Sequence, residues 1–170
     1  MLLSPPNDVK VTMNIQLPKV LKHELKELHE IQVCAFKALM EKYQDFETNP
    51  AVESLQKLEK RYAQPSGIYH FIRLKGKNIG AIRVIRSELQ HIIRISPMFI
   101  HPDYQNLHLG QEAVLQLERL YNDVKQWSLD TILQERKLCH FYERLGYTDT
   151  GKRENIKDGM DLIFYEKSLF

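Results

Sequence analysis

Apolar positions in the first third of the chain recur with a helical period. The residues after Pro18 that share one helix face are Leu21, Leu25, Leu28, Ala35 and Leu39. Pro18 can open this helix because its missing N–H is not needed in the first turn. A second, shorter helix is predicted to start at Asn49-Pro50, with Asn as its cap. Before both helices, the alternation of apolar and polar residues from Val9 to Ile15 predicts a strand.

Beyond Pro65-Ser66-Gly67 the period of the apolar positions shortens to two, which is typical of strands. Three such runs occupy residues 68–74, 79–85 and 91–100. They are joined by short polar segments at 75–78 and 87–90, so they predict an antiparallel meander.

The last third of the chain alternates between helices and strands. Its predicted elements are a helix at about 107–121, a strand at 127–133, a helix at 136–145, and strands at 147–153 and 160–168. Gly146 is expected to end the second helix in a left-handed conformation, and Lys157-Asp158-Gly159 to form a hairpin turn. The whole order predicts one domain, residues 1–170, of the α/β (α+β) class, with helices packed on a mixed sheet.

Composition argues against several classes of protein. The 170 residues carry 24 Lys and Arg against 22 Asp and Glu, a net charge of +2, which is too balanced for a typical nucleic-acid binder. No apolar run of about 18 residues predicts a membrane span, and the N-terminus lacks the basic and apolar regions of a secretory signal. A cytoplasmic protein is therefore expected. Cys34 and Cys139 fit no metal spacing and are expected to be reduced thiols in the core, so no metal is expected.

The most informative segment runs from Ile100 to Gln111. It leads from an apolar strand, through a turn marked by Pro102, into the start of an amphipathic helix. The first turn of a helix has unpaired N–H groups and a partial positive charge from the macrodipole. This segment therefore predicts a binding site for a phosphate group.

Two motifs in this context resemble those of the GNAT superfamily of N-acetyltransferases. The cofactor loop of that family, Gln/Arg-x-x-Gly-x-Gly/Ala, is matched by Gln105-Asn106-Leu107-His108-Leu109-Gly110. Its late Tyr-x-Lys/Arg-x-Gly-Phe/Tyr segment is matched by Tyr142-Glu143-Arg144-Leu145-Gly146-Tyr147. The resemblance covers nearly the whole chain and implies a GNAT-like fold, a twisted, mixed and largely antiparallel sheet of about six to seven strands with about four helices packed on it.

The resemblance also implies a reaction, the transfer of the acetyl group from acetyl-CoA, the cosubstrate, to an amine by direct attack in a ternary complex. Backbone N–H groups of residues 105–110 would hold the pyrophosphate, and the pantetheine arm would pair with the strand before the loop. A backbone N–H near Phe99 or Ile100 would stabilise the oxyanion, and Pro97 would sit at an irregularity of that strand. The expected cofactor-binding residues are Met98, Phe99, Ile100, Gln105, Asn106, Leu107, His108, Leu109, Gly110 and Glu135.

Two of these positions depart from the family pattern. His108 replaces the first glycine of the loop, where its side chain either contacts the phosphates or faces solvent. Glu135 stands where many members have an Asn that hydrogen-bonds the arm, and an ionised carboxylate can only accept hydrogen bonds. These departures leave a rival interpretation open, a non-catalytic module that binds acyl-CoA. A structural partner protein is a further alternative.

Tyr142 is the expected catalytic residue. It matches the tyrosine of the family that faces the CoA sulfur, and a phenol, with an ordinary pKa near 10, can protonate the leaving thiolate. The alternative is a core or rim tyrosine. Tyr142 lies one position off the apolar set Leu138, Phe141 and Leu145, which favours its exposure.

The general base is left open by the sequence, because no acid occurs in the strand that precedes the loop. Glu135, Asp130 and His91 are candidates, although a structural role is preferred for each of them. A proton relay through water is the preferred route. His101 is expected to be a turn residue.

The acceptor amine is equally open. Acidic and aromatic residues between Tyr43 and Pro50 either favour a cationic substrate or form a solvated helix end. Arg83, Arg86 and Arg94 could instead receive a carboxylate, although strand alternation puts Arg83 and Arg86 on opposite faces. A small-molecule amine is preferred over a protein amine, and neither nucleic acid nor a membrane is an expected partner. The apolar run at 162–165 is expected to be exposed and would suit a homodimer.

Overall fold

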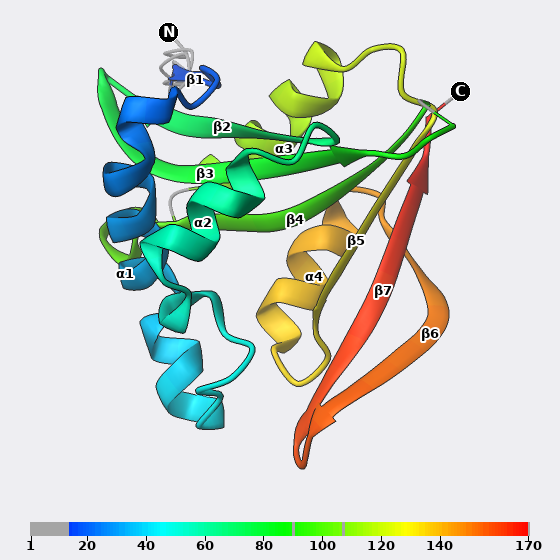
Figure 1. The fold of residues 1–170 in the computed structure, drawn as a ribbon. Helices are drawn as coiled ribbons and strands as arrows, with labels where there is room; N and C mark the ends of the chain where they lie inside the picture. The colour runs from blue at the N-terminus through cyan, green and yellow to red at the C-terminus, as the bar shows by residue number, and fades with distance from the viewer. Residues whose placement is uncertain (1–13, 90, 107, 170) are drawn as a thin grey trace, which may run out of the picture.

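The computed structural model describes residues 14–89, 91–106 and 108–169, which form one seven-stranded sheet with helices on both faces (Figure 1). The helical segments are η1 (Lys22–Glu24), α1 (Leu25–Tyr43), η2 (Pro50–Val52), α2 (Leu55–Tyr62), η3 (Pro102–Tyr104), α3 (Leu109–Leu120) and α4 (Arg136–Arg144). The strands are β1 (Ile15–Gln16), β2 (Gly67–Leu74), β3 (Lys77–Arg86), β4 (Ile92–Ile100), β5 (Gln126–Ile132), β6 (Thr148–Lys157) and β7 (Met160–Ser168).

The strand order is β1-β2-β3-β4-β5-β7-β6. Every neighbouring pair is antiparallel except β4 and β5, which are parallel and connected through α3. The prediction of a mixed, largely antiparallel sheet with four helices is therefore confirmed. The hairpin is confirmed as well: Lys157 pairs with Met160 across Asp158 and Gly159, and Gly159 has a φ of 78°.

The pairing of β4 with β5 is short. Only residues 92–94 of β4 pair with residues 126–128 of β5. Both strands then continue without pairing to each other, β4 to Ile100 and β5 to Ile132, and Figure 1 shows them fanning apart beside α4. We call these two unpaired stretches, residues 95–100 and 129–132, the β4–β5 splay. Each strand in the splay has one edge whose backbone groups lack a partner strand.

Alternating strand residues contribute to two cores, one on each face of the sheet. On one face, Ile82 and Trp127 pack with α3 and α4 through Leu117 and Cys139, all at 0% exposure. On the other face, the buried residues of α1, α2 and the sheet are Val20, Leu25, Leu28, Ile31, Leu58, Tyr69, Phe71, Ala81 and Phe99. The helices thus cover the sheet in two pairs, α3 with α4 and α1 with α2.

The N-terminal elements differ from their predicted bounds. The predicted strand from Val9 falls mostly outside the described residues, and β1 spans only Ile15 and Gln16. The first helix does not begin at Pro18, because Pro18 O accepts from Phe71 N and Val20 N donates to Tyr69 O, both at 2.9 Å. These bonds to β2 hold the segment extended until η1.

The second helix begins five residues later than predicted from the Asn49-Pro50 pair, because the chain straightens at Glu53 (ψ 128°). Asn49 does act as a cap, its Oδ1 accepting from Ala51 N at 2.8 Å, but of the short turn η2 only. Ser54 caps α2 itself, accepting from Lys57 N at 3.2 Å.

Outside the segment of Tyr142, two expectations about burial are wrong. Cys34 is exposed on α1, whereas Cys139 is buried as expected. The apolar run at 162–165 is not an exposed surface, because β7 lies inside the sheet between β5 and β6, and Ile163 and Tyr165 are 3% and 0% exposed. Leu162 and Phe164 on the other face are half-buried.

His70 is a buried polar residue in the middle of β2, with 1% of its surface exposed. Its Nδ1 lies 2.8 Å from Leu17 O, and its Nε2 lies 2.6 Å from the Tyr121 hydroxyl. A neutral ring satisfies both contacts, with Nδ1 donating to the carbonyl and Nε2 accepting from the phenol. Burial lowers the pKa of His70 below its ordinary 6.5.

Replacing His70 with Gln is expected to change the pH dependence of stability. Below pH 6.5 the unfolded chain takes up a proton that buried His70 does not, so the wild type loses up to about 1.4 kcal/mol per pH unit. His70→Gln lacks this loss but forfeits about 1 kcal/mol of hydrogen bonding at pH 8. The advantage of the wild type should therefore shrink from pH 8 to pH 5 in urea unfolding. A constant difference, or the same change in the surface control His140→Gln, would contradict a neutral His70.

Candidate functional site

The loop after β4 is built by local hydrogen bonds. Gln105 donates from Nε2 to Ile100 O at 2.8 Å, which ties the end of the loop back to the end of the strand. His101 Nδ1 accepts from Asp103 N at 3.2 Å, and Tyr104 N donates to His101 O at 2.9 Å. His101 is therefore the turn residue that was expected. Leu107 lies outside the described residues.

The start of α3 offers unpaired backbone donors. The first bond inside this helix runs from Glu112 N to His108 O at 3.3 Å, and no side chain caps the helix. Within the described part of the chain, the N–H groups of Leu109, Gly110 and Gln111 therefore have no partner. Together with the helix dipole, they make this end of α3 a favourable place for an anion.

His108 and Asn106 adopt a left-handed backbone, with φ of 58° and 66°. This conformation costs an ordinary residue roughly 1–2 kcal/mol, costs Asn less and costs glycine little. The left-handed backbone at position 108 explains why the family has a glycine there. This chain keeps the same backbone conformation with a histidine. The His108 side chain is exposed and caps nothing.

The strand before the loop is irregular where Pro97 was expected to disturb it. Ile82 of β3 pairs with Met98 and Val84 pairs with Ile95, so Arg83 alone faces Ser96 and Pro97. This is a bulge in β4, and the Ser96–Pro97 peptide bond is cis.

The N–H groups of β4 alternate in direction after the bulge. His101 N donates to Ile79 O at 2.7 Å, so every second residue back along β4, including Phe99, faces β3. Gly80 permits this close approach, because a Cβ there would lie 2.2 Å from Phe99 O. By alternation, the N–H groups of Met98 and Ile100 point into the splay. Of the two expected oxyanion donors, Ile100 therefore fits and Phe99 does not.

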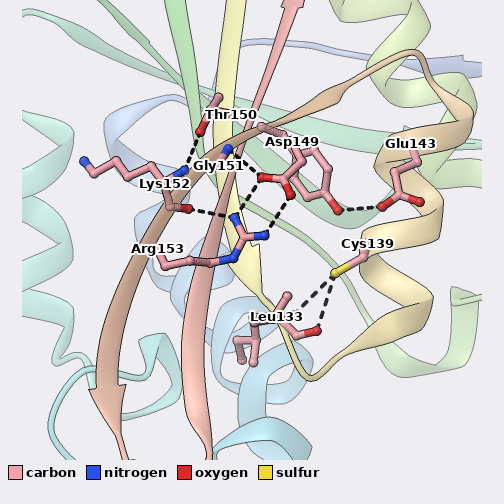
Figure 2. A network of polar contacts seen from close by, with 10 residues as sticks. Leu133, Cys139, Glu143, Asp149, Thr150, Gly151, Lys152 and Arg153 are labelled. Atoms are coloured by element: carbon pink, nitrogen blue, oxygen red, sulfur yellow. Dashed lines mark hydrogen bonds and ion pairs between the residues drawn. The ribbon is translucent and has the colours of Figure 1, made fainter.

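Helix α4, on the far side of the splay, is anchored to the sheet by polar contacts. Glu143 Oε1 accepts from the Tyr165 hydroxyl on β7 at 2.9 Å, and Cys139 Sγ lies 3.7 Å from Leu133 O (Figure 2). Between these two residues, the Phe141 ring would be 3.1 Å from a Cβ added to Gly110, so α4 and the first turn of α3 are in close contact. The two helices thus fix the position of Tyr142 relative to the loop.

Tyr142 is buried, at 8% exposure, and the expectation of an exposed side chain is wrong. The inward stripe of α4 consists of Cys139, Tyr142 and Leu145, because Phe141 is turned toward α3. The Tyr142 ring packs edge-on against Phe141 at 4.9 Å between ring centroids. Its hydroxyl has no hydrogen-bond partner within the described residues. The hydroxyl oxygen nevertheless keeps some solvent-accessible surface. The ring is packed while the hydroxyl can still meet a ligand.

The electrostatic environment keeps this phenol neutral. Burial, and then the negative charge of Asp130, raise the pKa of Tyr142 well above its ordinary value of 10. Asp130 lies on β5 and forms an ion pair with Arg94 on β4, at the point where the two strands part. A neutral phenol with a free hydroxyl can donate a proton or a hydrogen bond.

The carboxylate of Glu135 accepts hydrogen bonds from two side chains at the end of α1. Its Oε1 accepts from Lys42 Nζ and from the Tyr43 hydroxyl, both at 2.6 Å. Partial burial opposes the effect, but these two hydrogen bonds hold the pKa of Glu135 below its ordinary value. Burial and the contact with Glu135 raise the pKa of Tyr43 to about 12. Glu135 therefore acts here as an ionised acceptor rather than as a proton carrier.

Sequence reasoning missed the long-range contacts at the outer end of the site, although it had singled out the segment that begins at Tyr43. Lys42 and Tyr43 reach Glu135 across 93 and 92 residues of sequence, and Lys157 in the hairpin donates to Gln44 O at 3.0 Å. No local pattern signals such contacts. His91, by contrast, lies at the paired end of β4, roughly 30 Å along the strand from the loop, and cannot serve as a base there.

The arrangement fits the group that the motifs imply. Three helix N–H groups can receive phosphate oxygens, and the free edge of β4 at Met98 and Ile100 can pair with an amide chain. Two surface hollows of about 360 and 560 Å³ lie elsewhere, beside Leu120 of α3 and beside Tyr62 of α2. Over the described ranges, no three His, Cys, Asp or Glu side chains cluster as a metal site would require. Nor does any described helix have the length and apolarity needed to cross a membrane.

Replacing His108 with Gly is expected to stabilise the protein by about 1 kcal/mol, since it removes left-handed strain from a non-glycine residue. Thermal unfolding should show a midpoint about 2–4 °C higher. Asn106→Gly should give a smaller gain, because Asn tolerates this conformation better. The exposed turn residue Asp103, which is not left-handed, provides the control, and Asp103→Gly should lower stability by about 0.5–1 kcal/mol. A loss for His108→Gly equal to that control would refute the strain argument.

Comparison with known proteins agrees with this geometry. Among solved structures, an acetyltransferase from Thermus thermophilus is 16% identical, with a TM-score of 0.72 over 92% of this chain and 97% of that one. Spermidine N-acetyltransferase from Vibrio cholerae, in complex with CoA and spermine, is 17% identical, with a TM-score of 0.73 over 91% and 95%. The ribosomal-protein-S18-alanine N-acetyltransferase from Escherichia coli is 15% identical, with a TM-score of 0.72 over 91% and 94%.

These similarities concern the fold, since identity is low. No curated protein sequence matches the chain significantly. A family model described as an acetyltransferase (GNAT) domain matches residues 35–169, which include the bulged strand, the loop, α3 and α4. The chain therefore belongs to the GNAT acetyltransferase family.

Proposed function

We propose that this protein is an acetyl-CoA-dependent N-acetyltransferase that passes the acetyl group to an amine by direct attack in a ternary complex. The observation that carries the proposal is the β4–β5 splay, which brings together a free strand edge, unpaired N–H groups of α3 and the unpartnered hydroxyl of Tyr142. Each of these features can donate a hydrogen bond to a ligand. Membership of the GNAT family supports acetyl-CoA as that ligand.

The cofactor-binding residues divide into two sets. The N–H groups of Leu109, Gly110 and Gln111 would bind phosphate oxygens, with Gln105, Asn106 and His108 shaping the loop. The edge of β4 at Met98 and Ile100 would pair with the amides of the pantetheine arm, while Phe99 supports that edge from the α1 side. When bound, the cofactor supplies an acetyl thioester.

Two groups of the chain would stabilise the charges that develop during transfer. The N–H of Ile100 points into the splay, where it can donate to an oxyanion. Tyr142 holds a proton at its hydroxyl, because burial and Asp130 disfavour the phenolate, and donates it to the leaving sulfur.

The amine must lose a proton before it attacks. Asp130 is paired with Arg94, and Glu135 accepts from Lys42 and Tyr43, so both acids near the site already serve ion pairs or hydrogen bonds. Water leading to bulk solvent is therefore the proton acceptor that we propose. A small-molecule amine is the proposed substrate, in line with spermine, the amine in the complex of the Vibrio cholerae enzyme.

The rival function is a module that binds acyl-CoA without turnover. The engagement of Glu135 by α1 and the strained His108 favour it. The two functions differ in their dependence on the Tyr142 hydroxyl. Acetyl transfer needs a proton donor beside the leaving sulfur, whereas binding of acyl-CoA without turnover does not.

Calorimetric titration with acetyl-CoA at physiological salt should give a dissociation constant of about 1–10 μM, or roughly −7 to −8 kcal/mol. Tyr142→Phe should retain this affinity while lowering kcat toward an amine panel by about 10²- to 10⁴-fold. Tyr62→Phe, which removes a remote hydroxyl on α2, is the matched control and should change neither value.

The outcomes separate the alternatives. Acetyl-CoA binding without acetylation of any amine would favour the binding module. Acetylation that is unchanged in Tyr142→Phe would remove Tyr142 from its role. An absence of binding would exclude both functions, and the fold would then serve some other purpose.

A further inference from the structure

Arg83, in the middle of β3, has a buried guanidinium that pairs with no carboxylate of the described residues. Only 6% of its surface is exposed. Its Nη2 donates to the neutral Gln64 Oε1 at 2.7 Å, and its Nε is shielded from solvent and has no hydrogen-bond partner among the residues that the structure describes. None of the ion pairs formed by described residues includes Arg83.

The neighbouring arginines on the same face do have acidic partners. Arg61 of α2 pairs with Glu53, and Arg94 of β4 pairs with Asp130. Burying a charge without a partner is costly, and folded proteins normally pair such groups. Arg83 is thus the arginine of this cluster that forms no ion pair within the described residues. Burial first, and then the charges of Arg61 and Arg94, lower the pKa of Arg83, whereas Tyr69 and Glu53 act in the opposite direction.

The guanidinium of Arg83 lies on a shelf formed by Gly67 and Tyr69 of β2. A Cβ on Gly67 would lie 2.6 Å from Nη2 and 2.8 Å from Nε, so only glycine at position 67 allows this placement. The Tyr69 ring lies beneath, 5.6 Å from Cζ. The Tyr69 hydroxyl is also buried, and among the described residues it donates no hydrogen bond, although Arg61 lies close to it. Two donors on one shelf, Arg83 and Tyr69, therefore have unused hydrogen-bonding capacity.

This shelf lies on the α1–α2 face of the sheet, level with the bulge in β4. Arg83 is the β3 residue that faces Ser96 and Pro97, and its guanidinium extends toward β2, where Gly67 lies. Two strand spacings, about 10 Å, separate β2 from β4. A chain of that length could have one end at the shelf and the other at the splay. The phosphates of the cofactor would lie on the opposite face, at the start of α3.

We propose that Arg83 and the Tyr69 hydroxyl form a subsite for the carboxylate of the acceptor, so that the substrate is an amine with a carboxylate about 10 Å from its nitrogen. This inference rests on the proposed acetyl transfer and adds a substrate class to it. The carboxylate would supply the missing counter-charge of Arg83 and would orient the amine toward the splay.

Probe compounds of graded length test the subsite directly. In calorimetry with CoA present, 8-aminooctanoate, which spans roughly 10 Å, should bind the wild type about 10- to 100-fold more tightly than 8-aminooctanamide. 4-Aminobutanoate is too short to reach both ends and should show no such advantage over its amide. Arg83→Met should abolish the preference for the acid. Arg86→Met, on the opposite face beside Asp123, should retain it.

Stability separates a binding role from a structural one. If the role of Arg83 is to bind the carboxylate, Arg83→Met should raise the thermal midpoint of the free protein, because the substitution removes a buried charge that forms no ion pair. Gln64→Glu, a change at an exposed residue, should also raise the midpoint and should weaken binding of 8-aminooctanoate by supplying a competing carboxylate. A lower midpoint for Arg83→Met together with an unchanged acid preference would overturn the proposal.

Kinetics distinguish failure of the subsite from failure of the enzyme proposal. Equal kcat/KM for 8-aminooctanoate and its amide, unaffected by Arg83→Met, would refute the subsite while acetyl transfer stands. Preferential binding of the acid without transfer to either compound would refute acetyl transfer and retain the carboxylate subsite.

Discussion

The parting of β4 from β5 is the constraint on which the site depends. A continuous parallel ladder would use every backbone group of both strands and leave nothing for a ligand. Here the ladder ends after three residue pairs, and the buried Ile93 and Trp127 keep that end closed. The bulge at Ser96 and Pro97 then turns the rest of β4 so that its free edge leads to the loop and to α3. The loss of a few sheet hydrogen bonds is offset by the helices that pack against the opened strands.

The helices on the two faces contribute different chemistry to this opening. On one face, α3 provides backbone donors and α4 a neutral phenol, both of which suit a phosphorylated thioester. On the other face, the sheet presents Arg83 and Tyr69, while the end of α1 is tied to Glu135 and to the hairpin through Lys157. The opening is thus bounded on both sides by side chains, so the acetyl donor and the acceptor that we propose would approach each other from opposite faces.

What could be predicted from the sequence depended on how local the cause was. Gly146 and the Asp158-Gly159 turn follow from backbone rules and appear at the expected positions. The two short motifs located the loop and Tyr142, because they preserve a strand, turn and helix in order. The burial of Tyr142 was mispredicted, since a count of apolar residues treats tyrosine as polar and cannot see that Phe141 turns toward Gly110. The contacts of Glu135 could not be predicted from local sequence patterns, because they join residues far apart along the chain.

Strand β6 has a consequence for how the protein behaves at high concentration. It forms one edge of the sheet, and its first eight residues are all exposed. Its pairing with β7 is interrupted twice, and Asp149 and Arg153 bind each other across the first interruption (Figure 2). A flat, unbroken edge would invite a strand from another molecule. The interrupted and charged edge of β6 is a poor template for pairing with a strand of another molecule. We therefore expect this edge not to promote aggregation, although the sheet is open at the β4–β5 splay.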